Sequence, residues 1–163
     1  MAKHNPLERK ITDWTGKQRI TWCGPFAVAT VAGTEYEPAH QTLKIIRGKR
    51  HCKGVSNDNI AKALKTFGIK GKWTTLDKKR KLSKFVFENL EQGKVYIIQI
   101  TRHVLVMDTR DWTTIDNQVA IWRAMDASHH WSKRLVHAFY EVENPKFESQ
   151  CDDQLTFDFE LAS

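Results

Sequence analysis

Hydrophobic residues recur along the chain with two spacings, one typical of helices and one typical of strands. An apolar run over residues 26–32 begins directly after Cys23-Gly24-Pro25 and ends at Gly33. Proline is favoured in the first turn of a helix, and glycine is favoured just beyond its last turn. The pattern therefore predicts one short apolar helix with Cys23 at its N-terminus.

Three further segments show helical spacing, and each has a capping or helix-ending residue at one end. We predict helices over residues 34–47, 56–67 and 83–92. Residues 118–133 are compatible with a helix followed by a loop that contains His129-His130-Trp131.

Five segments have the residue types and the alternation of strands. They cover residues 72–76, 95–100, 103–107, 112–115 and 134–142. Residues 95–100 are almost continuously apolar, as expected of a strand that is covered on both faces.

The length of 163 residues predicts one domain, over residues 1–145, followed by an acidic tail over residues 146–163. Apolar residues make up 40% of the chain, which indicates a folded protein and not a disordered one. No apolar run approaches the ~20 residues of a membrane span, and the N-terminus lacks the apolar core of a signal peptide. We therefore expect a cytoplasmic protein that does not contact a membrane.

The formal charge of +7 is unevenly distributed. The tail has one basic and five acidic residues, a net charge of −4, so the remaining 145 residues carry +11. Such a body can attract nucleic acid or an acidic protein. The densest basic run is Lys78, Lys79, Arg80 and Lys81. We interpret it as a solvated loop, because no interleaved aromatic residues and no nucleic-acid motif accompany it.

The three cysteines, Cys23, Cys52 and Cys151, lack the spacing of a disulfide framework, so we expect reduced thiols. His51 precedes Cys52, but zinc sites need four ligands, usually in paired spacings. No such pairing is found with the other His and Cys residues, so no metal and no cofactor are expected.

Cys23 is a candidate nucleophile because the N-terminus of a helix favours the thiolate. His103 stands where a predicted strand begins, and Asp116 and Asn117 follow the next strand. A cysteine hydrolase needs a thiol, an imidazole that takes its proton, and a third group that orients the imidazole. Neighbours on a strand point to opposite faces, so only one of Asp116 and Asn117 can serve as that third group.

The motifs CGPFAVATVAG and RHVLVMD…TIDN, with Gln18 five positions before Cys23, resemble the papain-like cysteine peptidases. The resemblance is greatest to their compact branch, which includes the bacteriocin leader-processing (double-glycine) peptidases and related bacterial and phage proteins. It implies an α+β fold in which an N-terminal helical part, carrying the Cys helix, packs on a C-terminal antiparallel sheet. Arg102 precedes His103 where such proteins often have glycine.

The same resemblance assigns roles to the candidate residues. Cys23 would be the nucleophile, His103 the base and Asp116 the residue that orients the imidazole, with Asn117 as its alternative. The side-chain amide of Gln18 would donate to the oxyanion.

Two functions follow from the sequence. The first is a cysteine peptidase, isopeptidase or amidase that cleaves a peptide or protein substrate through a thioester. The alternative is a basic binding protein without enzymatic activity, for nucleic acid or a host protein, which includes a catalytically silent papain-like relative.

Overall fold

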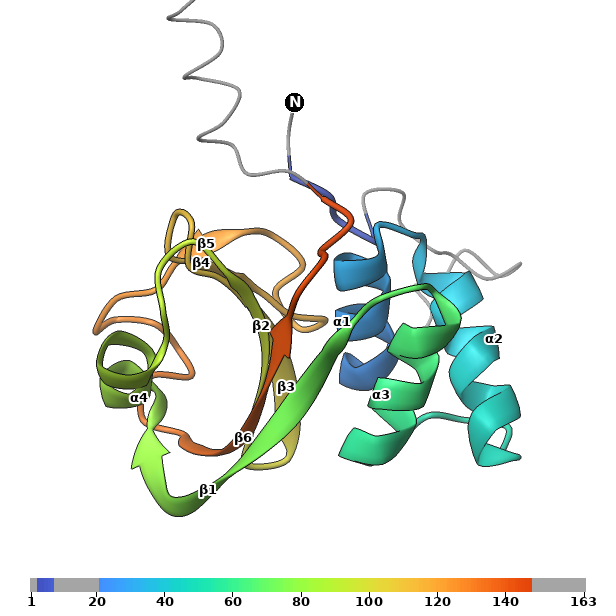
Figure 1. The fold of residues 1–163 in the computed structure, drawn as a ribbon, viewed down its shortest axis with the longest axis horizontal. Coiled ribbons are helices and arrows are strands. Elements are labelled where there is room, and N and C mark those ends of the chain that lie inside the picture. Colours follow the sequence, from blue (N-terminus) through green and yellow to red (C-terminus); the bar gives the residue numbers. More distant parts are fainter. Residues whose placement is uncertain (1–2, 8–20, 148–163) are drawn as a thin grey trace, which may run out of the picture.

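The computed structural model describes residues 3–7 and 21–147, and these residues form four helices and a six-stranded sheet (Figure 1). Three helices precede the sheet in the chain, and the fourth lies between its first two strands. The helices are α1 (Cys23–Ala32), α2 (Tyr36–Arg47), α3 (Asn57–Thr66) and α4 (Leu82–Asn89).

All neighbouring strands of the sheet are antiparallel, in the order β1-β6-β2-β3-β4-β5. β6, the last strand of the described residues, is therefore inserted between the first two. The strands are β1 (Gly71–Lys81), β2 (Val95–Ile100), β3 (His103–Asp108), β4 (Thr113–Ile115), β5 (Arg123–Ala124) and β6 (Leu135–Val142). The predicted α+β class, with N-terminal helices on an antiparallel sheet, is confirmed.

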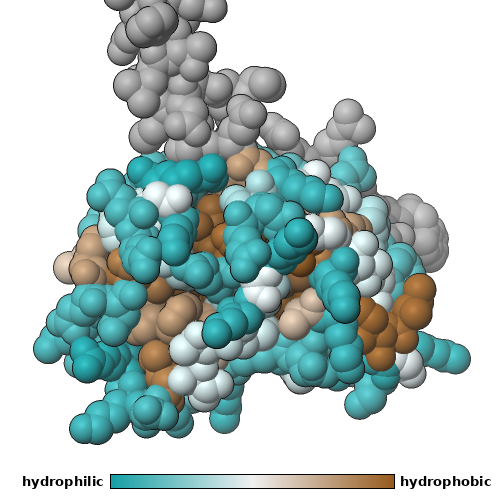
Figure 2. Space-filling model, in the orientation of Figure 1, coloured by the Kyte–Doolittle hydropathy of each residue, from teal (hydrophilic) through white to brown (hydrophobic). Residues whose placement is uncertain are grey.

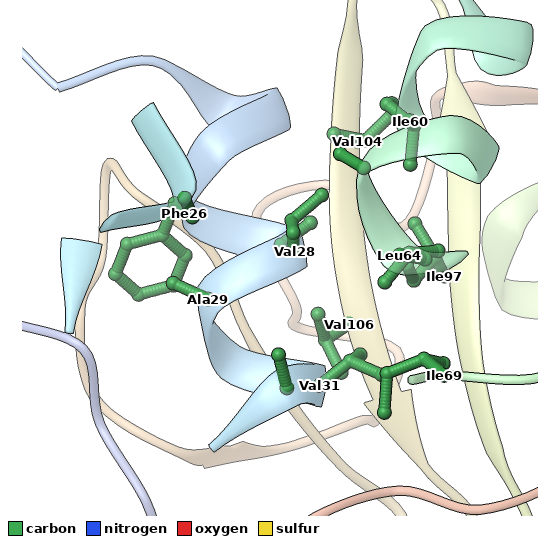
Figure 3. Packing of buried hydrophobic residues seen from close by; sticks show 14 of the residues in the cluster. Phe26, Val28, Ala29, Val31, Ile60, Leu64, Ile69, Ile97, Val104 and Val106 are labelled. Carbon is green, nitrogen blue, oxygen red and sulfur yellow. The ribbon is translucent and has the colours of Figure 1, made fainter. Parts of the chain in front are cut away.

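The sheet separates two hydrophobic cores. Val104 and Val106 of β3 join the core shared with α1, α2 and α3 (Figure 3). Leu105 and Met107 point to the other face and join the core shared with α4. Because β2 and β3 are buried on both faces, their sequences are almost continuously apolar, as predicted.

Helix α1 is surrounded by protein on all sides. Every residue from Gly24 to Ala32 is buried, and the helix ends at Gly33, which has the left-handed conformation (φ +65°). A β carbon on Gly33 would lie 2.3 Å from the carbonyl oxygen of Lys146, so only glycine fits there. The predicted start and end of this helix are confirmed.

Two segments differ from the sequence-based expectation. Residues 118–133 contain no helix, and the only regular element among them is the two-residue strand β5. Asp116 Oδ1 accepts hydrogen bonds from the backbone N–H groups of Gln118 and Val119, at 2.8 and 2.9 Å. A side chain that takes these amides offers the backbone an alternative to a helical turn.

The basic run 78–81 is also not a loop, since it forms the end of β1. Arg80 pairs with Val136 and Lys81 with Leu135 of β6, so long-range strand pairing decides its conformation. All four basic side chains of the run are exposed.

The packed part of the chain extends beyond residue 145, where the acidic tail was expected to start. Phe147 is buried in the core that contains α1, and the backbone N–H of Lys146 donates to the carbonyl oxygen of Val31 at 2.9 Å. The rest of the tail lies outside the described residues.

The surface facing the viewer in Figure 2 is mainly hydrophilic, with hydrophobic side chains in small separate areas. Within residues 3–7 and 21–147, no helix is long and apolar enough to cross a bilayer.

Residues 3–7 contact both the helical part of the fold and the loop that follows β4. His4 Nε2 lies 2.7 Å from the carbonyl oxygen of Thr34, and its own carbonyl oxygen accepts a hydrogen bond from Trp122 Nε1 at 3.0 Å. Lys3 Nζ is buried 2.8 Å from Asp108 Oδ2 and lies over the Trp122 ring. An isolated buried carboxylate is costly, so Lys3 compensates part of the charge of Asp108.

We predict that Lys3→Ala lowers the free energy of unfolding by about 3 kcal/mol, because it removes a cation from a buried ion pair. Denaturant unfolding of the variant measures this loss. Lys62→Ala is the matched control, since Lys62 pairs with Asp58 while both side chains are exposed (60% and 75%). It should cost about 0.5 kcal/mol or less. Equal losses in the two variants would contradict the structural role assigned to Lys3.

Candidate active site

Cys23 is the first residue of α1, and its position is fixed by close backbone contacts. The backbone N–H of Trp22, the residue before the helix, donates to the hydroxyl of Tyr36 at 2.9 Å. Gly24 packs directly on Val55, which would lie 3.2 Å from a β carbon at that position. A larger residue at position 24 would push the N-terminus of α1 away from the loop before α3.

His103 is the first residue of β3, and it faces the same cleft as Cys23. Burial raises the pKa of the Cys23 thiol, but hydrogen bonding to His103, the charge of that ring and backbone hydrogen bonds from Val104 and Gly24 outweigh it. The pKa of Cys23 is therefore held below its usual value. This is the effect that converts a cysteine into a nucleophile.

The imidazole of His103 is almost completely buried, with 7% of the residue exposed. Burial lowers the pKa of His103, but the neighbouring Asp116 carboxylate and the Cys23 thiol raise it to about 9. His103 Nε2 lies 3.6 Å from Asp116 Oδ2, which is an ion-pair distance and too long for a hydrogen bond.

Asp116 is held in place by three donors. Its Oδ1 accepts the two backbone hydrogen bonds from Gln118 and Val119, and its Oδ2 accepts one from Trp131 Nε1 at 2.6 Å. Burial raises the pKa of Asp116, but His103 and these donors lower it to about 2. The carboxylate therefore stays ionised next to the imidazole.

Asn117, the alternative third residue, does not face His103. Its Nδ2 donates to the carbonyl oxygen of Thr21 at 3.0 Å, so it fixes the segment just before α1 instead. The structure thus brings together Cys23, His103 and Asp116. Gln18, the predicted oxyanion donor, lies outside the described residues.

Sequence reasoning did not assign a role to Trp131, although this residue contacts two members of the group. Its indole donates to Asp116, and its ring packs on the imidazole of His103 with centroids 4.7 Å apart. His130 also approaches Asp116, with Nε2 3.6 Å from Oδ2. The cluster His129-His130-Trp131 was the only signal, and it does not say which residue reaches the carboxylate.

Among the described residues, no three His, Cys, Asp or Glu side chains are grouped so that they could hold a metal ion.

Comparisons with models of protein families, with curated proteins and with solved structures find no match to this chain.

We predict that Asp116→Asn lowers the pKa of His103 by about 1 to 3 pH units, because the imidazolium loses a neighbouring negative charge. The titration of the imidazole, followed by NMR, measures the change. Asn117→Ala is the matched control, since Asn117 contacts Thr21 and not the imidazole. A pKa that moves in Asn117→Ala and stays constant in Asp116→Asn would reverse the assignment of the third residue.

Proposed function

We propose that the protein is a cysteine hydrolase of the papain-like type, which cleaves an amide bond in a peptide or protein substrate. The observation that supports this most strongly is the grouping of three residues from separate parts of the chain. Cys23 of α1 and His103 of β3 line one cleft, and Asp116, directly after β4, lies 3.6 Å from the imidazole of His103. The directions of their pKa shifts agree with a thiolate, an imidazolium and a carboxylate. Perturbed titrating groups in a cleft are typical of catalytic sites.

In the proposed mechanism, His103 takes the proton of the Cys23 thiol. Because Nε2 faces Asp116, Nδ1 is the nitrogen left for the thiol. The thiolate attacks the carbonyl carbon of the scissile amide, and a carbon–sulfur bond forms while the carbonyl oxygen becomes an oxyanion. The Cys23 backbone N–H at the helix start stabilises this oxyanion, a contribution of about 3 kcal/mol per donor in known enzymes.

The imidazolium then gives its proton to the leaving amine, and the carbon–nitrogen bond breaks to leave a thioester. Water attacks the thioester while His103 takes one of its protons. The carboxylic acid product leaves, and the proton returns to Cys23. Asp116 keeps the imidazole oriented through both steps.

The alternative function, binding of nucleic acid by the basic surface, has one observation in its favour. The exposed basic side chains of residues 78–81 lie on β1, at the edge of the sheet. Such binding would weaken steeply with salt and would not depend on Cys23.

The proposed function predicts that Cys23 reacts with iodoacetamide as a thiolate at neutral pH, because the pKa of its thiol lies well below the ~8.5 of a free cysteine. The rate should level off once the thiolate has formed and change again near pH 9, where His103 loses its proton. In His103→Ala the rate at pH 7 should fall about tenfold or more. Peptide mass spectrometry over a range of pH measures each cysteine separately.

Cys52 is the internal control for this experiment. It is 1% exposed, and burial raises the pKa of its thiol, so it should react slowly in both proteins. A Cys23 that titrates normally, or that reacts equally fast without His103, would exclude the hydrolase and leave the binding function.

A further inference from the structure

A cleft of about 530 Å³ opens beside the Cys23 thiol. One wall is the segment that leads into α3, and the other is the hairpin of β2 and β3. The residues along these walls are Lys53, Val55, Ser56, Gln99, Arg102 and Val104. Asn57 Nδ2 donates to Gln99 Oε1 at 2.7 Å, so a hydrogen bond joins α3 to β2 near the cleft.

The side chains of the cleft combine an apolar floor with positive charge. Ile60 of α3 and Val104 of β3 are buried and line the cleft together with Cys23, and Figure 3 shows their side chains at the same end of the core. Besides the Cys23–His103 pair, Lys53 and Arg102 contribute positive charge, and among the described residues no carboxylate lines the cleft. Lys53 and Arg102 are exposed residues, so solvent screens part of their attraction for a carboxylate.

Arg102 occupies a backbone conformation that favours glycine. Its φ is +60°, in the two-residue turn between Ile100 and His103, which pair with each other. A left-handed conformation carries a steric cost for any residue with a β carbon. Backbone strain beside a functional site is a reason to look for a role of the side chain. Arg102 directly precedes His103 in the chain, and both residues line the cleft.

We propose that Arg102 and Lys53 select a substrate with an acidic side chain, Asp or Glu, next to the bond that Cys23 attacks. This inference rests on the proposed hydrolase function and adds its specificity. A guanidinium binds a carboxylate through two parallel hydrogen bonds, and Lys53 adds a second charge across the cleft. The apolar floor accommodates the methylene groups of the same side chain.

The test uses two peptide chloromethyl ketones, acetyl-Glu-Gly and acetyl-Gln-Gly, which differ only in the charge of one side chain. In a second pair the order of the two residues is reversed, which places the carboxylate one residue closer to the reactive chloromethyl ketone. In each reaction the Cys23 sulfur bonds to the methylene carbon and chloride leaves. Mass spectrometry of the intact protein and of its peptides gives the rate at Cys23.

In one of the two pairs, the Glu reagent should react about tenfold faster than its Gln counterpart, as expected of a charge-assisted contact. In the double variant Lys53→Gln/Arg102→Gly this preference should fall to about twofold or less. Glycine suits the conformation at position 102, so the turn should still form.

Lys84→Gln is the matched control, because Lys84 is an exposed residue of α4, on the other side of the sheet. It removes one positive charge but should keep the preference for Glu.

Equal rates for Glu and Gln in both pairs, with Cys23 labelled fast and in a His103-dependent way, would overturn the specificity and leave the hydrolase intact. A Glu preference that survives in the double variant would also overturn it. Failure of every reagent to label Cys23 would overturn the specificity together with the proposed function.

Discussion

The candidate site depends first on the packing of α1 against β3. Cys23 is the first residue of the helix and His103 the first residue of the strand, so this contact sets the distance between thiol and imidazole. The contacting side chains are small or β-branched, among them Val28, Val31 and Val106, and all three are fully buried (Figure 3). Burial of each of these side chains stabilises the fold by about 1.5–3 kcal/mol. A site built on rigid elements holds its geometry better than one built on loops.

A second constraint is the buried charge of Asp116. A carboxylate that is 3% exposed must be compensated, and here the backbone after β4, the indole of Trp131 and the imidazole of His103 all contribute. Residues 117–134 form no helix and supply three of these donors, the backbone N–H groups of Gln118 and Val119 and the indole of Trp131. The same carboxylate lies 3.6 Å from the imidazole of His103, which it would orient in the proposed mechanism.

Local signals in the sequence were enough to predict much of this arrangement. Pro25 and Gly33 mark the ends of α1, Ser56 caps α3 through the backbone N–H of Asn59, and the apolar run of β2 indicates a strand covered on both faces. What the sequence did not predict depends on partners far away in the chain. β6 inserts between β1 and β2, and this pairing extends β1 through its basic residues. The contact of Trp131 with Asp116 arises in the same way, from a loop whose path no periodicity describes.

We propose that Cys23, His103 and Asp116 act as one acyl-transfer unit. The most direct measurement is the reaction with p-nitrophenyl acetate, combined with the mass of the trapped protein. A working unit gives a burst of p-nitrophenol, an acetyl group on Cys23, and then steady turnover as His103 activates water against the thioester. In His103→Ala, both the burst and the turnover should be lost. Acetylation that spreads over lysines and other cysteines, or turnover that continues without His103, would contradict the claim.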